Sequence, residues 1–190
     1  MAVTQELIAR YSTPGLPEPA IWSRLLGDHP KHAEACPVWD RFSGRNWVHL
    51  MEKQPKFADM CPWERLDGRD WAYLLQYQPQ FAEHCTWDLL DGEDWYYLLK
   101  DKPQFHDKCD WDKLDGWDWS HLLAVQPHLA QYCTWWCLRD RHWVYLLSQQ
   151  PQLAEYCSDW RGISQRDLQM LHNASPDNKD FETWLLLSSL

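Results

Sequence analysis

A 24-residue period runs through most of this 190-residue chain. Tryptophan, proline and cysteine keep this step in phase, and the tryptophans of the main series are Trp47, Trp71, Trp95, Trp119 and Trp143. A second tryptophan series keeps the same step, at Trp39, Trp63, Trp87, Trp111 and Trp135. Several series in phase predict structural repeats, in which each unit becomes stable only by stacking on its neighbours. We expect both tryptophan series to be structural, with each ring packing against its copy in the next unit.

One further unit lies upstream around Trp22 and Cys36, offset by 25 residues from the next. The chain therefore holds six units over residues 22–160. Residues 1–21 and 161–190 carry different patterns, and a finite solenoid needs atypical end units. We expect these two segments to be the N-terminal and C-terminal caps.

Each unit reads as three short helical pieces. A W-x-x-L turn comes first, followed by a W-x-x-L-L helix whose spacing places the ring and the leucines on one face. The Q-P pair ends that helix, because the residue before proline is pushed out of the α region, and proline begins the third piece. None of the pieces is long enough to be stable alone. The sequence therefore predicts an all-α solenoid of six short helical repeats of about 24 residues, with N- and C-terminal capping helices.

Glycine and aspartate between the first two pieces are expected to shape the helix ends. The glycines stand where a left-handed residue would end the preceding turn, at Gly68, Gly92 and Gly116. The aspartates two residues later are expected to cap the following helix, at Asp70, Asp94 and Asp118.

The segment "CTWDLLDGEDWYYLLKDKPQF", residues 85–105, and its copies resemble a family of short tryptophan- and cysteine-containing helical repeats in uncharacterised bacterial or phage proteins. The resemblance covers residues 22–160 and implies a scaffold of bacterial or phage origin. It brings no catalytic residues, so it implies no enzymatic role for any position.

Charge and hydropathy narrow the partners that the chain can take. It has 28 acidic and 18 basic residues, a formal net charge of −10, so nucleic-acid phosphates and anionic membranes repel it. The N-terminal residues lack the apolar region of a secretory signal, and no stretch approaches the ~20 apolar residues of a membrane span. We therefore expect a cytoplasmic protein with no membrane contact.

Cysteine and histidine do not predict a metal or catalytic site. Equivalent cysteines on stacked helices would lie about 8–10 Å apart, whereas a disulfide needs Cα atoms within about 7 Å. The sequence has no CxxC pair, no HExxH pattern and no nucleophile elbow. Only Cys133 and Cys137 form a plausible close pair, for which a redox or metal role stays open. We expect no catalytic residue, metal or cofactor, and therefore no enzyme.

Two tryptophans break the repeat pattern and are candidate partner-binding residues. Trp117 stands in a column otherwise filled by Arg45, Arg69, Glu93 and Arg141. Trp136 stands in a column otherwise filled by Asp40, Glu64, Asp88 and Asp112. Because these columns tolerate polar residues, both rings are expected to be partly exposed, and exposed aromatic residues are enriched in binding hot spots. The alternative is that they contact the terminal cap.

A second candidate surface is the column two residues after the helix tryptophan. Its members are large side chains with a polar tip, among them Tyr73, Tyr97, His121 and Tyr145. Such a ridge is either a contact surface for a partner or the rim of the core with its polar tips in water.

The third candidate is a concentration of acidic residues. Residues 67–118 hold thirteen acidic and five basic residues, a net formal charge of −8. Some of the aspartates are helix caps, and the candidate partner-binding acids are Asp91, Glu93 and Asp115. This segment is suited to a basic partner.

These features together favour a non-enzymatic protein-binding repeat module, in which acidic residues steer a basic partner and aromatic residues anchor it. A small acidic protein of this kind would suit an inhibitor, such as an immunity protein or a phage-encoded blocker of a nucleic-acid-handling enzyme. Two alternatives remain. Single-stranded nucleic acid could stack on exposed rings, although this needs an electropositive groove, or the chain could be a purely structural spacer.

Overall fold

The computed structural model describes residues 5–188, which contain helices and no β-strand. The chain divides into two compact units, Met1–Leu90 and Asp91–Leu190.

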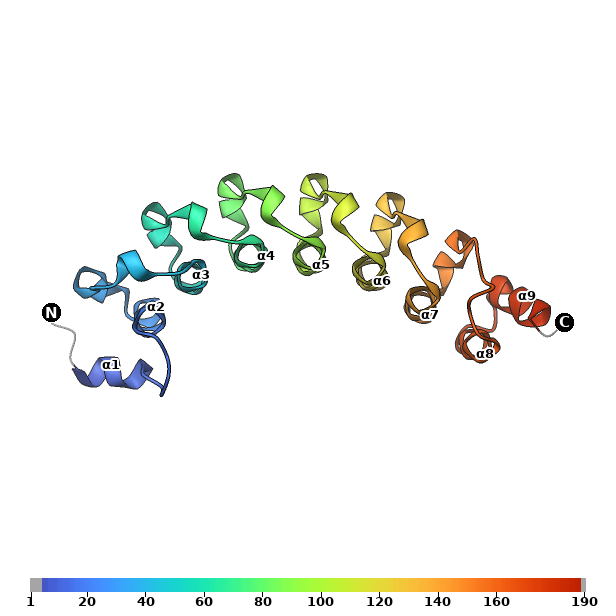
Figure 1. The fold of residues 1–190 in the computed structure, drawn as a ribbon, viewed down its shortest axis with the longest axis horizontal. Coiled ribbons are helices and arrows are strands. Elements are labelled where there is room, and N and C mark those ends of the chain that lie inside the picture. Colours follow the sequence, from blue (N-terminus) through green and yellow to red (C-terminus); the bar gives the residue numbers. More distant parts are fainter. Residues whose placement is uncertain (1–4, 189–190) are drawn as a thin grey trace. The chain divides into compact units, whose positions relative to one another are not determined.

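The first unit is built from four α-helices and a set of short 3-10 helices. The α-helices are α1 (Gln5–Tyr11), α2 (Glu18–Asp28), α3 (Gly44–Lys53) and α4 (Gly68–Tyr77). The 3-10 helices span Pro30–Ala35, Trp39–Arg41, Pro55–Met60, Trp63–Arg65, Pro79–His84 and Trp87–Leu89. Helices α2, α3 and α4 lie side by side in one row, and the 3-10 helices form a second row along them (Figure 1).

The second unit repeats this arrangement. Its α-helices are α5 (Gly92–Asp101), α6 (Gly116–Val125), α7 (Asp140–Gln149), α8 (Gln165–Ala174) and α9 (Lys179–Leu187). Its 3-10 helices span Pro103–Lys108, Trp111–Lys113, Pro127–Tyr132, Trp135–Cys137 and Pro151–Tyr156. Helices α5 to α8 pack in sequence, each on the next, beside their own row of 3-10 helices (Figure 1).

The predicted all-α solenoid of about 24-residue repeats is confirmed. Helices α3 to α7 have ten residues each, whereas the pieces that flank them have only three or six and are 3-10 helices. Pieces this short suit the tighter 3-10 winding, which is used in runs of few residues. One repeat is therefore an α-helix with a 3-10 helix before and after it.

The two regular tryptophans of a repeat stack on each other. Their ring centroids are 5.2–5.4 Å apart, in the pairs Trp39–Trp47, Trp63–Trp71, Trp111–Trp119 and Trp135–Trp143. The helix tryptophan is the more buried partner, with 2% of Trp47 and 0% of Trp119 exposed. Each of these pairs forms inside one repeat, so these four units have an aromatic core of their own. The expected packing of each ring on its copy in the next repeat stays a prediction.

The glutamine of the Q-P pair joins neighbouring repeats. Its side-chain amide donates to a backbone carbonyl near the end of the preceding repeat's α-helix, over donor–acceptor distances of 2.6–2.8 Å. The bonds run from Gln54 to Gly27, Gln78 to Glu52, Gln126 to Lys100 and Gln150 to Ala124. These bonds satisfy carbonyls that the end of a helix leaves without an intrahelical partner.

The α-helices begin three residues earlier than the capping prediction placed them. The N-cap residues are Asp67, Asp91 and Asp115, and the predicted caps Asp70, Asp94 and Asp118 stand at the third helical position. The two aspartates form a reciprocal capping box: Asp118 N–H donates to Asp115 Oδ1, and Asp115 N–H donates to Asp118 Oδ2, both over 3.0 Å.

The prediction of left-handed glycines is wrong. Gly68, Gly92 and Gly116 are the first residues of α4, α5 and α6, and Gly15 is the only residue with positive φ in the part of the chain that the structure describes. Close contact between repeats explains the glycines instead. A Cβ on Gly92 would lie 2.5 Å from the Lys113 carbonyl oxygen and would collide with the Asp118 carboxylate of the next repeat. Glycine therefore allows the start of one α-helix to touch the start of the next.

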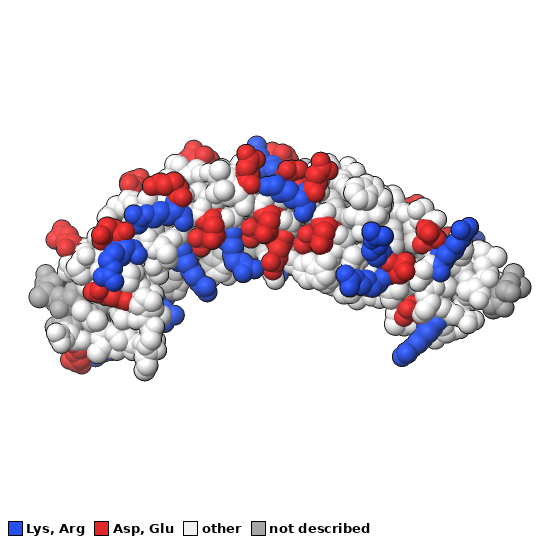
Figure 2. Space-filling model, in the orientation of Figure 1, with Lys and Arg blue, Asp and Glu red and all other residues white. Residues whose placement is uncertain are grey.

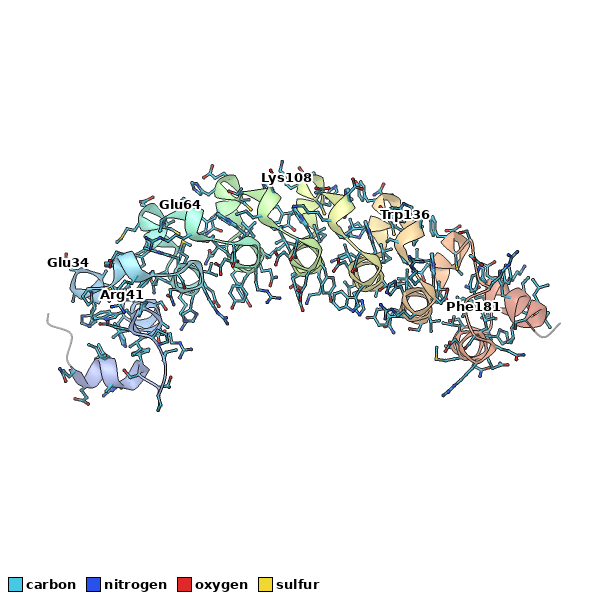
Figure 3. All side chains as sticks on the ribbon, viewed as in Figure 1. Glu34, Arg41, Glu64, Lys108, Trp136 and Phe181 are labelled. Atoms are coloured by element: carbon cyan, nitrogen blue, oxygen red, sulfur yellow. The ribbon has the colours of Figure 1, made fainter. Side chains whose placement is uncertain are left out.

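Helices at both ends cover the repeats. The first repeat helix, α2, begins at Glu18, inside the segment expected to be the N-terminal cap, and the Tyr11 hydroxyl of α1 donates to Asp28 of α2 over 2.9 Å. At the other end, Phe181 of α9 is fully buried and contacts Trp160 (Figure 3). The Asn178 amide donates to the Pro151 carbonyl over 2.8 Å, which holds α9 against the last 3-10 helix.

Candidate partner-binding surface

Five aromatic residues of α5, α6 and α7 form a continuous group, here called the aromatic row: Tyr96, Tyr97, Trp117, His121 and Tyr145. The His121 ring lies between Trp117, at a centroid distance of 4.0 Å, and Tyr145, at 4.3 Å, and stacks on both. The Tyr96 ring meets the Trp117 ring edge-on at a centroid distance of 5.3 Å. Its centroid lies 5.0 Å from that of Tyr97, and these two rings are tilted against each other. The row therefore crosses three successive repeats.

Helix geometry explains why these rings meet. Trp117 and His121 are four residues apart on α6, a spacing that places side chains on the same helix face. Tyr97, His121 and Tyr145 stand at equivalent positions, so they come into line when the repeats stack. The Nδ1–H of His121 donates a hydrogen bond to the Trp117 carbonyl oxygen over 2.8 Å, and this bond orients the imidazole between its neighbours.

The aromatic row is part of the protein surface. Trp117 is 41% exposed, and Tyr97 and Tyr145 are each 38% exposed. Large aromatic side chains held in this way offer apolar area and polar tips to a partner without having to be ordered on binding.

The aromatic row already contacts one cation. The Lys100 ammonium lies 5.9 Å from the centroid of Tyr96 and 5.6 Å from that of Tyr97. A positive charge at this range is attracted by the negative face of an aromatic ring. The row can therefore hold a basic group against its rings.

An open pocket of about 470 Å³ adjoins the row, and Trp117 belongs to both. The other pocket-lining residues are Asp91, Gly92, Glu93, Lys113, Asp115 and Asp118. Four carboxylates and one ammonium group therefore line the pocket together with Trp117. Figure 2 shows Asp and Glu side chains clustered over α5, and Lys and Arg side chains near α7.

Burial raises the pKa of the Asp118 carboxyl to about 6, and repulsion from Asp115, Asp91 and Glu93 adds to the effect. The backbone N–H of Asp115 opposes both by donating to the Asp118 carboxylate. Negative charge is therefore already unfavourable at the floor of the pocket, and a positive group placed there would relieve it.

The pocket unites the three predicted acids, Asp91, Glu93 and Asp115. Other acids of the same segment lie beside lysines, with Asp107 Oδ2 3.3 Å from Lys108 Nζ and Asp101 Oδ2 4.0 Å from Lys100 Nζ. The acidic segment is therefore divided between the pocket and mixed-charge surface.

Two predicted residues lie outside the aromatic row. Trp136 is 84% exposed on the row of 3-10 helices (Figure 3), which argues against the alternative that it packs on the terminal cap. Tyr73 belongs to the first unit, where it is 42% exposed, its hydroxyl donates to Glu52 over 3.3 Å, and its ring lies 4.9 Å from Tyr77.

Five residues of this surface were not predicted: Tyr96 and Lys100 at the aromatic row, and Gly92, Lys113 and Asp118 in the pocket. Tyr96 follows the helix tryptophan directly, in a column that holds Val48, Ala72, Ser120 and Val144 in other repeats. Val48, Ala72 and Ser120 are buried, so the large Tyr96 ring can only extend toward the surface. The sequence signal was thus the size of Tyr96 relative to its siblings.

The cysteines are free thiols, and burial raises the pKa of Cys61 and Cys85 to about 12. Burial also raises the pKa of Cys133, and that of Cys137 to about 11. Protonated thiols are poor nucleophiles and poor metal ligands. Over residues 5–188, no cluster of three or more His, Cys, Asp or Glu residues is arranged to hold a metal ion.

Within that same range, no helix combines the length and the apolar character that crossing a membrane would require. Comparison of the chain with family models, curated proteins and solved structures found no match in any of the three. The resemblance to short bacterial or phage repeats therefore stays a prediction.

Proposed function

We propose that this chain is a non-enzymatic repeat module that binds a basic protein through the aromatic row and the adjoining pocket. The observation that carries the proposal is the position of Trp117, which belongs both to a three-repeat row of exposed rings and to a pocket with four carboxylates. Aromatic residues at the centre of an interface supply most of its affinity, and complementary charge supplies rate and specificity.

The solenoid supports such binding by presenting a prearranged surface. The rings project from α-helices that are capped at their start and joined by glutamine–carbonyl bonds at their end. Side chains that are already ordered lose little entropy when a partner binds, so more of the contact energy appears as affinity.

In its fuller form, the proposal is that the partner is a nucleic-acid-handling enzyme and that the chain inhibits it in the cytoplasm, as an immunity protein or a phage-encoded blocker does. The formal charge of −10 and the carboxylates of the pocket support this role. A cluster of carboxylates competes for the basic surface that such an enzyme uses to hold phosphates.

The same features disfavour direct binding of single-stranded nucleic acid. The His121 ring is already stacked between Trp117 and Tyr145, and the adjoining carboxylates repel phosphates. We expect a labelled single strand to show no change in fluorescence anisotropy with this protein at low salt.

A pull-down with two matched variants tests the proposal. Trp117→Glu and Trp136→Glu remove the same ring and add the same charge, and other repeats carry Glu93 and Glu64 at the equivalent positions. We expect a basic protein to be retained by wild type and by Trp136→Glu, lost with Trp117→Glu, and released by raised salt. Equal retention by all three proteins, or retention of acidic proteins only, would contradict the proposal.

A further inference from the structure

We propose that the pocket beside Trp117 accepts an arginine side chain of the partner, with the guanidinium group against the indole ring and hydrogen-bonded to the surrounding carboxylates. This inference rests on the proposed function and specifies the chemistry of its partner. It assigns a ligand group to a site defined by Asp91, Glu93, Asp115, Trp117 and Asp118.

The pocket has an equivalent place in the first unit. There, Asp70 of α4 has Arg45 of α3 as a neighbour, and the positive charge of Arg45 lowers the pKa of Asp70 against the larger, opposing effect of burial. Asp118 of α6 is the equivalent carboxylate, and Glu93 of α5 stands at the position of Arg45. At this pocket, the chain thus has an acidic residue at the position where the equivalent place in the first unit has an arginine.

The charge neighbourhood of Asp118 follows that replacement. Glu93 raises the pKa of Asp118, as do Asp115 and Asp91, whereas the equivalent residue Arg45 lowers that of Asp70. The arginine that the chain supplies to Asp70 is therefore missing at Asp118. A guanidinium group from a partner would restore the charge arrangement that the other repeat has within the chain.

A tryptophan also lines the pocket. Trp117 is 41% exposed, and it stands in a column where the chain otherwise uses arginine or glutamate. His121 stacks on the ring at 4.0 Å and Tyr96 meets it edge-on, so the indole is held in place. Tryptophan gives the strongest cation–π attraction of the aromatic side chains.

Arginine fits this combination better than lysine does. Its planar guanidinium can lie parallel to an indole ring while its five N–H groups point outward to carboxylates, and paired bonds to a carboxylate add strength. An ammonium group is a compact charge that keeps more of its hydration. The row also has its own ammonium group, since Lys100 lies over Tyr96 and Tyr97.

The test measures binding of three synthetic glycine–serine peptides that carry arginine, lysine or citrulline at the same spaced positions. Citrulline keeps the shape of arginine without its charge. We expect the arginine peptide to bind tightest, the lysine peptide several-fold more weakly and the citrulline peptide weakest, by fluorescence anisotropy at low salt.

Three variants locate the arginine. Trp117→Glu should weaken binding of the arginine peptide about tenfold. The variant adds a carboxylate, so a purely electrostatic contact would instead become tighter. Glu93→Arg, which restores the residue type found at position 45, should also abolish the preference for arginine, because the pocket then carries its own guanidinium. Trp136→Glu, on the row of 3-10 helices, should bind as wild type does. Circular dichroism of each variant verifies that the helices are retained.

The outcomes separate this inference from the proposed function. Equal affinity for arginine and lysine peptides, or full arginine affinity in Trp117→Glu, would overturn the arginine pocket while leaving a basic partner in place. Absence of binding by both basic peptides would overturn the two proposals together. A preference for arginine that both pocket variants remove and Trp136→Glu keeps would support them.

Discussion

Replacing Asp118 by asparagine should stabilise the protein at neutral pH. Asp118 is only 6% exposed, and burial together with neighbouring acids raises the pKa of its carboxyl from 3.8 to about 6. A carboxyl with a raised pKa holds its proton more tightly when the protein is folded. Its contribution to stability is therefore complete below about pH 3.8 and is lost as the pH rises through about 6. Asparagine removes the charge and with it this loss.

The magnitude follows from the two pKa values. The difference between 3.8 and about 6 corresponds to about 3 kcal/mol in the free energy of unfolding at neutral pH. The weaker hydrogen bond of a neutral acceptor to the Asp115 N–H is already contained in this difference, because that bond lowers the pKa of Asp118. The lost interaction with the helix dipole offsets about 0.5–1 kcal/mol. Asparagine fits the position, since Asn46 stands there in α3 and accepts from Ser43 N–H over 3.1 Å. We expect a net gain of about 2 kcal/mol at pH 7.

Urea unfolding at a series of pH values, followed by circular dichroism, measures this gain. The relevant quantity is the difference in unfolding free energy between Asp118→Asn and wild type, since other titrating groups cancel in it. The difference in unfolding free energy should grow from about pH 4 to pH 7. The matched control is Asp112→Asn, which removes the same charge from an exposed side chain. A difference that does not change with pH, or a variant less stable than wild type at pH 7, would refute the reasoning.

Two further predictions concern the framework. Trp119→Ala should lower the unfolding free energy by about 3–5 kcal/mol, because the ring is fully buried and stacked on Trp111. Trp136→Ala, which removes an exposed ring, should change it by less than about 0.5 kcal/mol. Equal effects of the two variants in urea unfolding would contradict the assignment of Trp119 to the core. Gly116→Ala should cost at least about 1–3 kcal/mol, because the new Cβ would lie 2.5 Å from the Cys137 carbonyl oxygen. Gly27→Ala is the control, since its Cβ would meet only the flexible Lys53 side chain at 3.1 Å, and a melting temperature equally reduced in both variants would contradict the contact argument.

The solenoid could be predicted because the period of 24 residues repeats the same contacts many times, and each repeat's information reinforces the others. The role of the glycines could not, because a glycine after L-D fits the end of one turn as well as the start of the next helix. Only the three-dimensional approach of Gly92 to Asp118 of the following repeat distinguishes the two. That contact depends on the spacing between stacked helices, which no local pattern encodes.

The candidate surface was predicted in part for a related reason. Trp117, His121 and Tyr145 stand out along the sequence, by breaking a column or by filling one with amphipathic side chains. Their mutual stacking and their closeness to the carboxylates depend on how α5, α6 and α7 pack, which the sequence does not specify. Tyr96 escaped prediction because its siblings are buried and small, so its column read as core.

The aromatic row takes its rings from three consecutive repeats, which ties the register of the surface to the number of units in the solenoid. The His121 ring is held between one neighbour from its own helix and one from the next. Inserting a complete unit between α6 and α7 would replace the Gln150–Ala124 bond and the Gly116–Cys137 contact by equivalent ones, yet it would move Tyr145 one repeat away from His121. The framework would thus tolerate a change in the number of repeats that the aromatic row would not. Evolution could therefore select the length of the solenoid and the composition of the row separately.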